Sequence, residues 1–194
     1  LAAVHLNGAP LWNQGAIEEE LRWGNRYFHR MVRPDGGLMD HVVLPLGWEE
    51  ERELYPNDPP HSTLFTFISG QALAAKVFKD SDAGYSRLSL DFARGAWRYA
   101  TDPALPQKPY DPPVVPKHHE WMTKAFEQSY PGSCLHWMGR LFAAMSLHAA
   151  CPEERWLDEA ALAADEVGKL QLGDSAEGPA AGCFRVAHDN PELV

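Results

Sequence analysis

The sequence predicts an all-α fold made of antiparallel helical hairpins, arranged as a toroid with long loops on one face. Apolar residues recur at spacings of three and four in several segments, which is the pattern of a helix with one buried face. Two pairs of these segments are joined by very short polar corners, and long loop-like stretches separate the pairs. A helical repeat protein would show the same rhythm, but no stretch recurs at a fixed period.

The first predicted helix covers residues 13–31, with Asn13 as its N-cap. Its apolar positions fall on one face, formed by Ile17, Leu21, Phe28 and Met31. Gly24 lies on the same stripe, although a glycine inside a helix costs about 1 kcal/mol relative to alanine. We therefore expect another backbone or a ligand to pack closely against Gly24.

A long loop is predicted over residues 32–60. It contains a tight turn at Pro34-Asp35-Gly36-Gly37 and a short strand over residues 38–44. Loops longer than about 12–15 residues are usually functional or disordered. This loop carries large apolar side chains such as Trp48 and Tyr55, so a functional loop is the better interpretation.

The next two helices are predicted over residues 63–78 and 82–99, with only the sequence KDSD at the corner between them. So short a corner makes the two helices antiparallel neighbours. The expected buried face of the first is Leu64, Phe67, Ile68, Gln71, Ala75 and Phe78. The expected buried face of the second is Tyr85, Leu88, Phe92, Ala96 and Tyr99.

A second hairpin follows a proline-rich loop over residues 101–131. Its helices are predicted over residues 133–150 and 153–172, separated at Cys151-Pro152 because proline cannot continue a helix. The expected buried face of the first is Leu135, Met138, Phe142 and Met145. The expected buried face of the second is Leu157, Ala160, Ala161, Ala164 and Val167.

Composition and charge exclude several function classes. The net charge is −10 and no basic run is present, which argues against nucleic acid and anionic membranes as partners. No apolar run reaches the roughly 20 residues that a membrane span needs, and no signal peptide is found. The chain starts at Leu1 and stops at Val194 without a finished element, so we expect a fragment cut at both ends.

Metal and cofactor motifs are not found in the sequence. The three cysteines form no CxxC pair and are predicted to be ordinary packing or surface residues. His118-His119-Glu120 lacks the HExxH spacing that places two histidines on one helix face, so a surface loop is favoured. We predict no metal site and no cofactor.

Several motifs together resemble glycoside hydrolase family 9, the cellulase-type enzymes of the six-hairpin (α/α)6 barrel. In chain order they are LRWGNRYFHRM, PDGGLMDHVV, HSTLFTFISGQALAAKVFKDSDAGYSRLSLDFARGAWRYA and LHWMGRLFAAMSLHAACPEERWLDEAALAAD. The resemblance covers about residues 18–170. It implies that residues 1–194 are part of a single (α/α)6 barrel catalytic domain, a partial toroid.

The resemblance also implies a reaction, the inverting hydrolysis of a β-glucosidic bond. One carboxylate activates water and a second protonates the leaving oxygen. In the family, the base belongs to an Asp-Ala-Gly-Asp motif before the first helix, and the acid is a glutamate far toward the C-terminus. Neither has a match here, so we predict no catalytic residue in this chain and no activity for the fragment alone. The resemblance further implies a carbohydrate substrate and a secreted or periplasmic location.

Five residues are predicted to bind substrate, on positions where the family lines its cleft: Asp40, His41, Trp48, Tyr130 and Trp137. Tryptophan stacks on the apolar face of a pyranose, and histidine donates to its hydroxyls. This chain departs from the family in two places. His41 and Trp48 are further apart than usual, and YPGSCLHW replaces the family's Y-x-D-E-L-x-W, so an acidic pair is missing. The departures suggest a divergent member whose substrate need not be cellulose.

Plainer interpretations of these residues stay open. Trp48 could instead pack its loop against the helices, and Trp137 could be an ordinary core residue. Asp40 could be a carboxylate exposed to solvent. Two other functions also remain. One is an epimerase or unsaturated uronyl hydrolase on the same scaffold, for which Arg140 and Arg185 are the candidate uronate clamps. The other is a non-catalytic helical binding module. The sequence leaves the sugar, the linkage and the oligomeric state undetermined.

Overall fold

The computed structural model describes residues 14–39, 41–43, 53–55, 61–103, 132–171 and 184. Within these residues the fold is helical, as predicted. The helices are α2 (Gln14–Arg30), α3 (His61–Val77), α4 (Ala83–Ala100), α6 (Cys134–Ala150) and α7 (Glu154–Leu170). Each helix boundary falls within two residues of its predicted position. None of the helices in the described ranges is long and apolar enough to cross a membrane.

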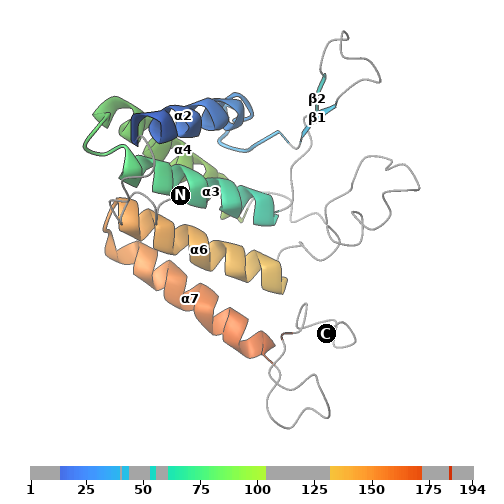
Figure 1. The fold of residues 1–194 in the computed structure, drawn as a ribbon. Coiled ribbons are helices and arrows are strands. Elements are labelled where there is room, and N and C mark those ends of the chain that lie inside the picture. The colour runs from blue at the N-terminus through green and yellow to red at the C-terminus, as the bar shows by residue number, and fades with distance from the viewer. Residues whose placement is uncertain are drawn as a thin grey trace.

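The helices form two antiparallel hairpins that lie side by side. Helix α3 packs against both α4 and α6, and α7 packs against α6 (Figure 1). The two short corners, α3 to α4 and α6 to α7, lie at the same end of the hairpins (Figure 1). The other end therefore carries the C-termini of α2, α4 and α7 and the N-termini of α3 and α6. We call it the loop end, because the predicted long loops start and finish there.

A small antiparallel strand pair lies beyond the loop end. Strand β1 (His41–Val43) pairs with β2 (Glu53–Tyr55), with His41 opposite Tyr55 (Figure 1). Within the predicted strand over residues 38–44, the described residues 41–43 form β1, while Leu38 forms an isolated bridge with Val32. Strand β2 was not predicted, because three residues are too few to show an alternating pattern.

The N-termini of α4 and α6 are capped by side chains, and the C-terminus of α6 is closed by a backbone bond. The Asp82 carboxylate accepts a hydrogen bond from the Tyr85 N–H at 2.9 Å, which starts α4. Ser133 caps α6 by accepting from the His136 N–H at 3.2 Å. Helix α6 ends with the Cys151 N–H bonded to the Leu147 carbonyl at 2.8 Å, just before Pro152. The first N–H groups of a helix have no partner within the helix, so side chains that accept from them stabilise the helix end.

Replacing Asp82 by alanine is expected to lower the melting temperature at pH 7 and to lower it less at pH 2. The Tyr85 N–H and the Arg22 guanidinium hold the pKa of Asp82 below its usual value of 3.8. A lowered folded-state pKa means that the ionised group stabilises the fold at neutral pH, and that this contribution disappears as pH falls through the folded pKa. Thermal melts at both pH values measure the difference, and Asp80→Ala in the same corner is the control. An equal loss at both pH values would contradict the assignment.

The core lies where α3 meets its two neighbours. Leu64, Phe65 and Ile68 of α3 are 0–1% exposed, and the Trp97 ring of α4 packs edge-on against Trp156 of α7 with centroids 5.3 Å apart. The predicted face of α3 is confirmed, since all six of its residues are buried. Alanines supply most of the facing surface on the other helices: Ala93, Ala96, Ala100, Ala143, Ala144 and Ala160. Small side chains allow neighbouring helices to pack closely, which explains the alanine-rich sequence.

The predicted buried face of α6 is wrong. Leu135, Met138, Phe142 and Met145 are 39–64% exposed, whereas the buried residues are His136, Ala143, Ala144 and Leu147. Helix α6 carries apolar residues on nearly all sides, so periodicity alone does not select the face. Helices α3 and α7 pack against the face with the smallest side chains, where the approach is closest.

The buried faces of α4 and α7 are shifted by about one residue from the prediction. In α4 Leu88 is exposed, while Ser89, Ala93 and Trp97 are buried. In α7 the predicted Leu157, Ala161 and Ala164 are exposed, and the buried residues are Trp156, Ala160, Ala163 and Leu170. Ala96 and Ala160 were predicted correctly. The shift brings one large ring of each helix, Trp97 and Trp156, into the core.

Helix α2 is attached to the first hairpin largely through polar and aromatic side chains. The Asn25 amide donates to the Tyr85 hydroxyl at 3.0 Å, and His29 Nε2 lies 2.9 Å from Gln71 Oε1. Arg22 pairs with Asp82 at 2.5 Å. Gln71 is 1% exposed, and its buried amide is satisfied by His29 and by Asn25, whose Oδ1 accepts from Gln71 Nε2 at 2.5 Å.

The expectation for Gly24 is not met in the part of the chain that the structure describes. A Cβ built on Gly24 has no neighbouring atom within 4 Å there. Phe28 of the predicted stripe is 49% exposed, while Met31 is buried. The contacts of α2 with the hairpin therefore include Asn25 and His29, while Ile17 and Leu21 of the predicted stripe are half-buried and Phe28 is exposed.

Candidate functional site

Two of the five predicted binding residues fall within the described ranges. His41 starts β1, and its backbone pairs with that of Tyr55. Trp137 lies in the first turn of α6 at the loop end. Asp40, Trp48 and Tyr130 lie outside the described residues. The structure thus places the start of the predicted cleft loop and one aromatic residue at the loop end, and the binding roles of all five remain predictions.

Trp137 is half-buried and packs against two neighbours. Its ring meets the His136 ring edge-on, with centroids 4.9 Å apart. The Arg140 guanidinium lies 5.6 Å from the Trp137 centroid, within the range of a cation–π contact. These contacts fix the orientation of the ring, which suits both a packing residue and a rigid stacking platform.

Arg140 is held by residues of the protein itself. Its guanidinium donates to Glu159 Oε2 of α7 from Nη2 at 2.5 Å and from Nε at 3.1 Å. The same group lies 5.7 Å from the Trp97 ring centroid, between the two tryptophans. A uronate clamp needs a guanidinium available for the substrate carboxylate. Arg140 is therefore a poor candidate for that role, and Arg185 lies outside the described residues.

His136 is a buried polar residue that the sequence did not single out. It is 6% exposed and packs edge-on against Phe65 with centroids 5.3 Å apart. Its neighbour Trp137 was predicted instead, because its position matches the tryptophan of the family motif Y-x-D-E-L-x-W. The sequence signal for His136 was Ser133, three residues earlier. Ser133 caps α6 by accepting a hydrogen bond from the His136 N–H.

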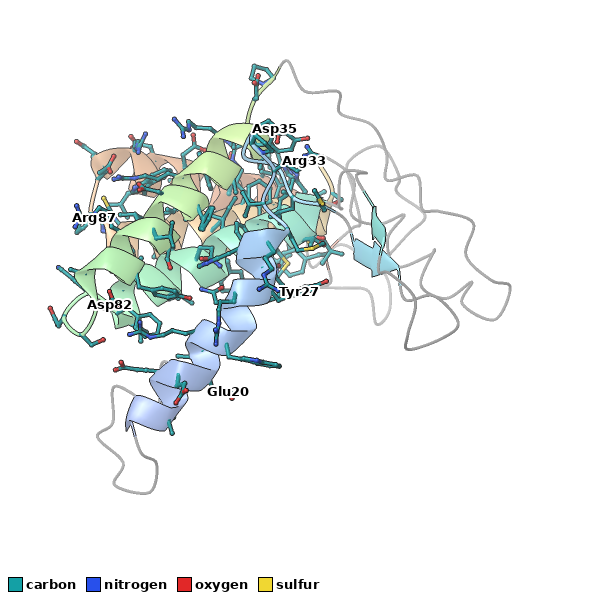
Figure 2. All side chains as sticks on the ribbon, turned by 90° about the horizontal axis from the view of Figure 1, so that it is seen from above. Glu20, Tyr27, Arg33, Asp35, Asp82 and Arg87 are labelled. Carbon is teal, nitrogen blue, oxygen red and sulfur yellow. The ribbon has the colours of Figure 1, made fainter. Side chains whose placement is uncertain are left out.

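The Pro34-Asp35-Gly36-Gly37 turn lies at the loop end, against the C-terminal half of α4 (Figure 2). The Asp35 carboxylate accepts from the Gly37 N–H at 2.9 Å, an arrangement that closes the turn. Arg33 reaches both carboxylate oxygens of Asp35 at 3.2 Å. Burial raises the pKa of Asp35, but the Gly37 N–H and Arg33 outweigh it, so the pKa lies below its usual value. Asp35 is therefore ionised at neutral pH.

Both glycines of this turn are required by close contacts. Gly36 has a φ of +92°, and a Cβ there would lie 2.7 Å from the Gly95 carbonyl oxygen of α4. A Cβ on Gly37 would overlap the Arg33 guanidinium and lie 2.8 Å from Tyr99 Cζ. Arg33 Nη2 also donates to the Tyr99 hydroxyl. The turn therefore contacts α4 through backbone and side chains, which the sequence did not predict.

The described cysteines have no nucleophilic character. Cys134 and Cys151 are free, and Cys183 lies outside the described residues. Burial and the Glu153 carboxylate raise the pKa of the Cys151 thiol and outweigh the neighbouring Arg94, which lowers it. The thiol is therefore neutral near pH 7. No group of three or more His, Cys, Asp or Glu in the described ranges could hold a metal ion.

Comparison with known proteins decides the family. The sequence model of glycosyl hydrolase family 9 matches residues 3–182. The chain belongs to glycosyl hydrolase family 9. A search of curated proteins finds no match. The family prediction from the motif order is therefore confirmed.

The fold of this family 9 chain is also similar to a solved structure. The crystal structure of a metagenome-derived glycoside hydrolase family 9 endoglucanase matches it with a TM-score of 0.55 and 23% identity. The match covers 77% of this chain and 26% of that chain. The prediction of a partial (α/α)6 toroid is thereby confirmed. The chain spans about a quarter of the endoglucanase, so the activity of the whole protein is a matter for proposal.

Proposed function

We propose that this chain is part of a glycoside hydrolase that cleaves a β-linked glucan or a related oligosaccharide with inversion. The observation that carries the proposal is the family match over residues 3–182. An inverting enzyme uses one carboxylate to activate water and another to protonate the leaving oxygen. In this proposal both carboxylates lie outside the chain, and residues 1–194 form part of a single (α/α)6 catalytic domain.

The chain contributes binding surface in this proposal. Trp48 and Trp137 stack on pyranose faces, His41 donates to a sugar hydroxyl, and Asp40 accepts from one. Tyr130 offers both a ring and a hydroxyl. Helix α6 keeps the Trp137 ring in a fixed position, and that reduces the entropy lost on binding. The pairing of Arg140 with Glu159, in which two guanidinium donors share one carboxylate oxygen, makes the uronate-directed alternatives less favourable.

The test uses the full-length gene product and a panel of soluble β-glucans, with acidic uronates as comparison substrates. Proton NMR of the first product formed reports its anomeric configuration. The proposal expects cleavage of a β-glucan and an initial α-anomer. A β-anomer would contradict inversion. Weak glucan binding without hydrolysis at any pH would overturn the enzyme proposal in favour of a binding module.

Replacing Trp48 by alanine is expected to raise KM for the cleaved glucan roughly 2- to 12-fold, the equivalent of one stacking contact. The value of kcat should change little if the ring stacks on the sugar equally in the ground state and the transition state. Trp48→Phe, which keeps an aromatic face, is the matched control and should lie between wild type and alanine. An unchanged KM for both variants would assign Trp48 to loop packing.

A further inference from the structure

We propose that Arg33 and Tyr99 are positioning residues for substrate binding, because together they fasten the base of the predicted cleft loop to α4. This inference rests on the proposed function, in which Asp40 and His41 contact the sugar. Neither Arg33 nor Tyr99 touches substrate in this proposal. They act by fixing the point from which strand β1 starts.

The first observation is the contact between the turn and α4. The Arg33 guanidinium donates to the Tyr99 hydroxyl and lies 5.0 Å from the centroid of that ring. Its side chain is only 16% exposed, and it also bonds both oxygens of the Asp35 carboxylate. One planar guanidinium thus joins the turn and the helix, with donors in two directions.

The second observation is the short path from this contact to β1. Val32 and Leu38 form a bridge, and the Met39 N–H bonds to the Met31 carbonyl at 2.8 Å. Leu38 is 4% exposed and belongs to the core. Only Met39 and Asp40 separate Leu38 from His41, where β1 begins. A change at the turn therefore reaches the predicted binding residues within a few peptide units.

The third observation is the independent backbone contact beside the side-chain contact. Gly36 meets the Gly95 carbonyl, and Gly37 leaves room for Arg33 and Tyr99 to meet. The turn is thus held to α4 at two adjacent points. Loss of the Tyr99 hydroxyl removes one of them and leaves the glycine contact, so the fold persists while the position of β1 loosens.

The test compares Tyr99→Phe and Arg33→Lys with Tyr85→Phe in the full-length gene product. Tyr85 is the matched control, since its hydroxyl also bonds from α4 to another segment, accepting from Asn25 of α2 at 3.0 Å. With the glucan that the enzyme cleaves, Tyr99→Phe should raise KM about 2- to 12-fold, the loss expected for one hydrogen bond. The kcat of this variant should stay near wild type, and Tyr85→Phe should leave both constants unchanged.

Hydrogen exchange gives a readout that does not depend on activity. Backbone amides of residues 38–43 should exchange faster in Tyr99→Phe than in wild type, and at the wild-type rate in Tyr85→Phe.

Faster exchange without any glucan hydrolysis would uphold the fastening role while the proposed function fails. Glucan hydrolysis with unchanged KM and unchanged exchange would overturn the inference. A lower melting temperature with unchanged KM would also overturn it, because the pair would then be structural only. If Arg33→Lys does not fold, Tyr99→Phe alone decides, since it removes a single oxygen.

Discussion

Replacing Phe65 by alanine is expected to destabilise the protein by about 3–5 kcal/mol, the usual cost of deleting a buried aromatic ring. Phe65 is 0% exposed and joins three helices. Its ring packs against Trp97 of α4 and His136 of α6, with centroid distances of 5.9 Å and 5.3 Å. Gly139 of α6 leaves room for it, because a Cβ there would lie 3.1 Å from Phe65 Cβ. The surrounding helices cannot easily close such a cavity. Denaturant unfolding of the 194-residue chain measures the loss.

Phe142→Ala is the matched control for this core prediction. Phe142 is 64% exposed, and its removal should change the stability of the same chain by no more than about 0.5 kcal/mol. The sequence pattern alone makes the opposite prediction, since it places Phe142 on the buried face of α6. A loss for Phe142→Ala as large as that for Phe65→Ala would show that the described packing of α6 is wrong.

Replacing Gly36 by alanine is expected to destabilise the protein by about 2–5 kcal/mol. A residue with a side chain costs about 1–2 kcal/mol in the left-handed region, where Gly36 has its φ of +92°. Overpacking adds about 1–3 kcal/mol, because the new Cβ would lie 2.7 Å from the Gly95 carbonyl oxygen. That atom belongs to a helix backbone and cannot rotate away.

Gly24→Ala is the control, because it is expected to stabilise the protein whereas Gly36→Ala destabilises it. Gly24 lies inside α2, and a Cβ there meets no described atom within 4 Å. Alanine should therefore stabilise the chain by about 1 kcal/mol, which corresponds to a rise in melting temperature of roughly 2–4 °C. Thermal melts of both variants provide the measurement. A stabilised Gly36→Ala variant would contradict the contact between the turn and α4.

The candidate site was less predictable than the helices. Trp137 could be placed at the start of α6 because helix periodicity and the Ser133 cap are local signals. The pairing of Arg140 with Glu159 could not be foreseen, since it depends on the rotation of α7 against α6. The fastening of Arg33 to Tyr99 joins residues far apart in the chain, and no pattern within either segment indicates it.

The helices, the two hairpins and the family could all be predicted from the sequence. These depend on local signals: the spacing of apolar residues, the corner sequences KDSD and CP, and the order of the motifs. Local patterns suffice there because a helix and a tight corner are formed by residues close together in the chain.

The buried faces of α4, α6 and α7 could not be predicted from the sequence and depend on how the helices pack. Helix α6 is apolar on nearly all sides, and the face that contacts α3 is the one with Ala143, Ala144 and Leu147 rather than the one with Phe142. The tertiary structure also decided that Gly36 meets Gly95. The physical reason is the same for both. Close packing depends on the shape of the partner surface, and that surface belongs to residues distant in the sequence.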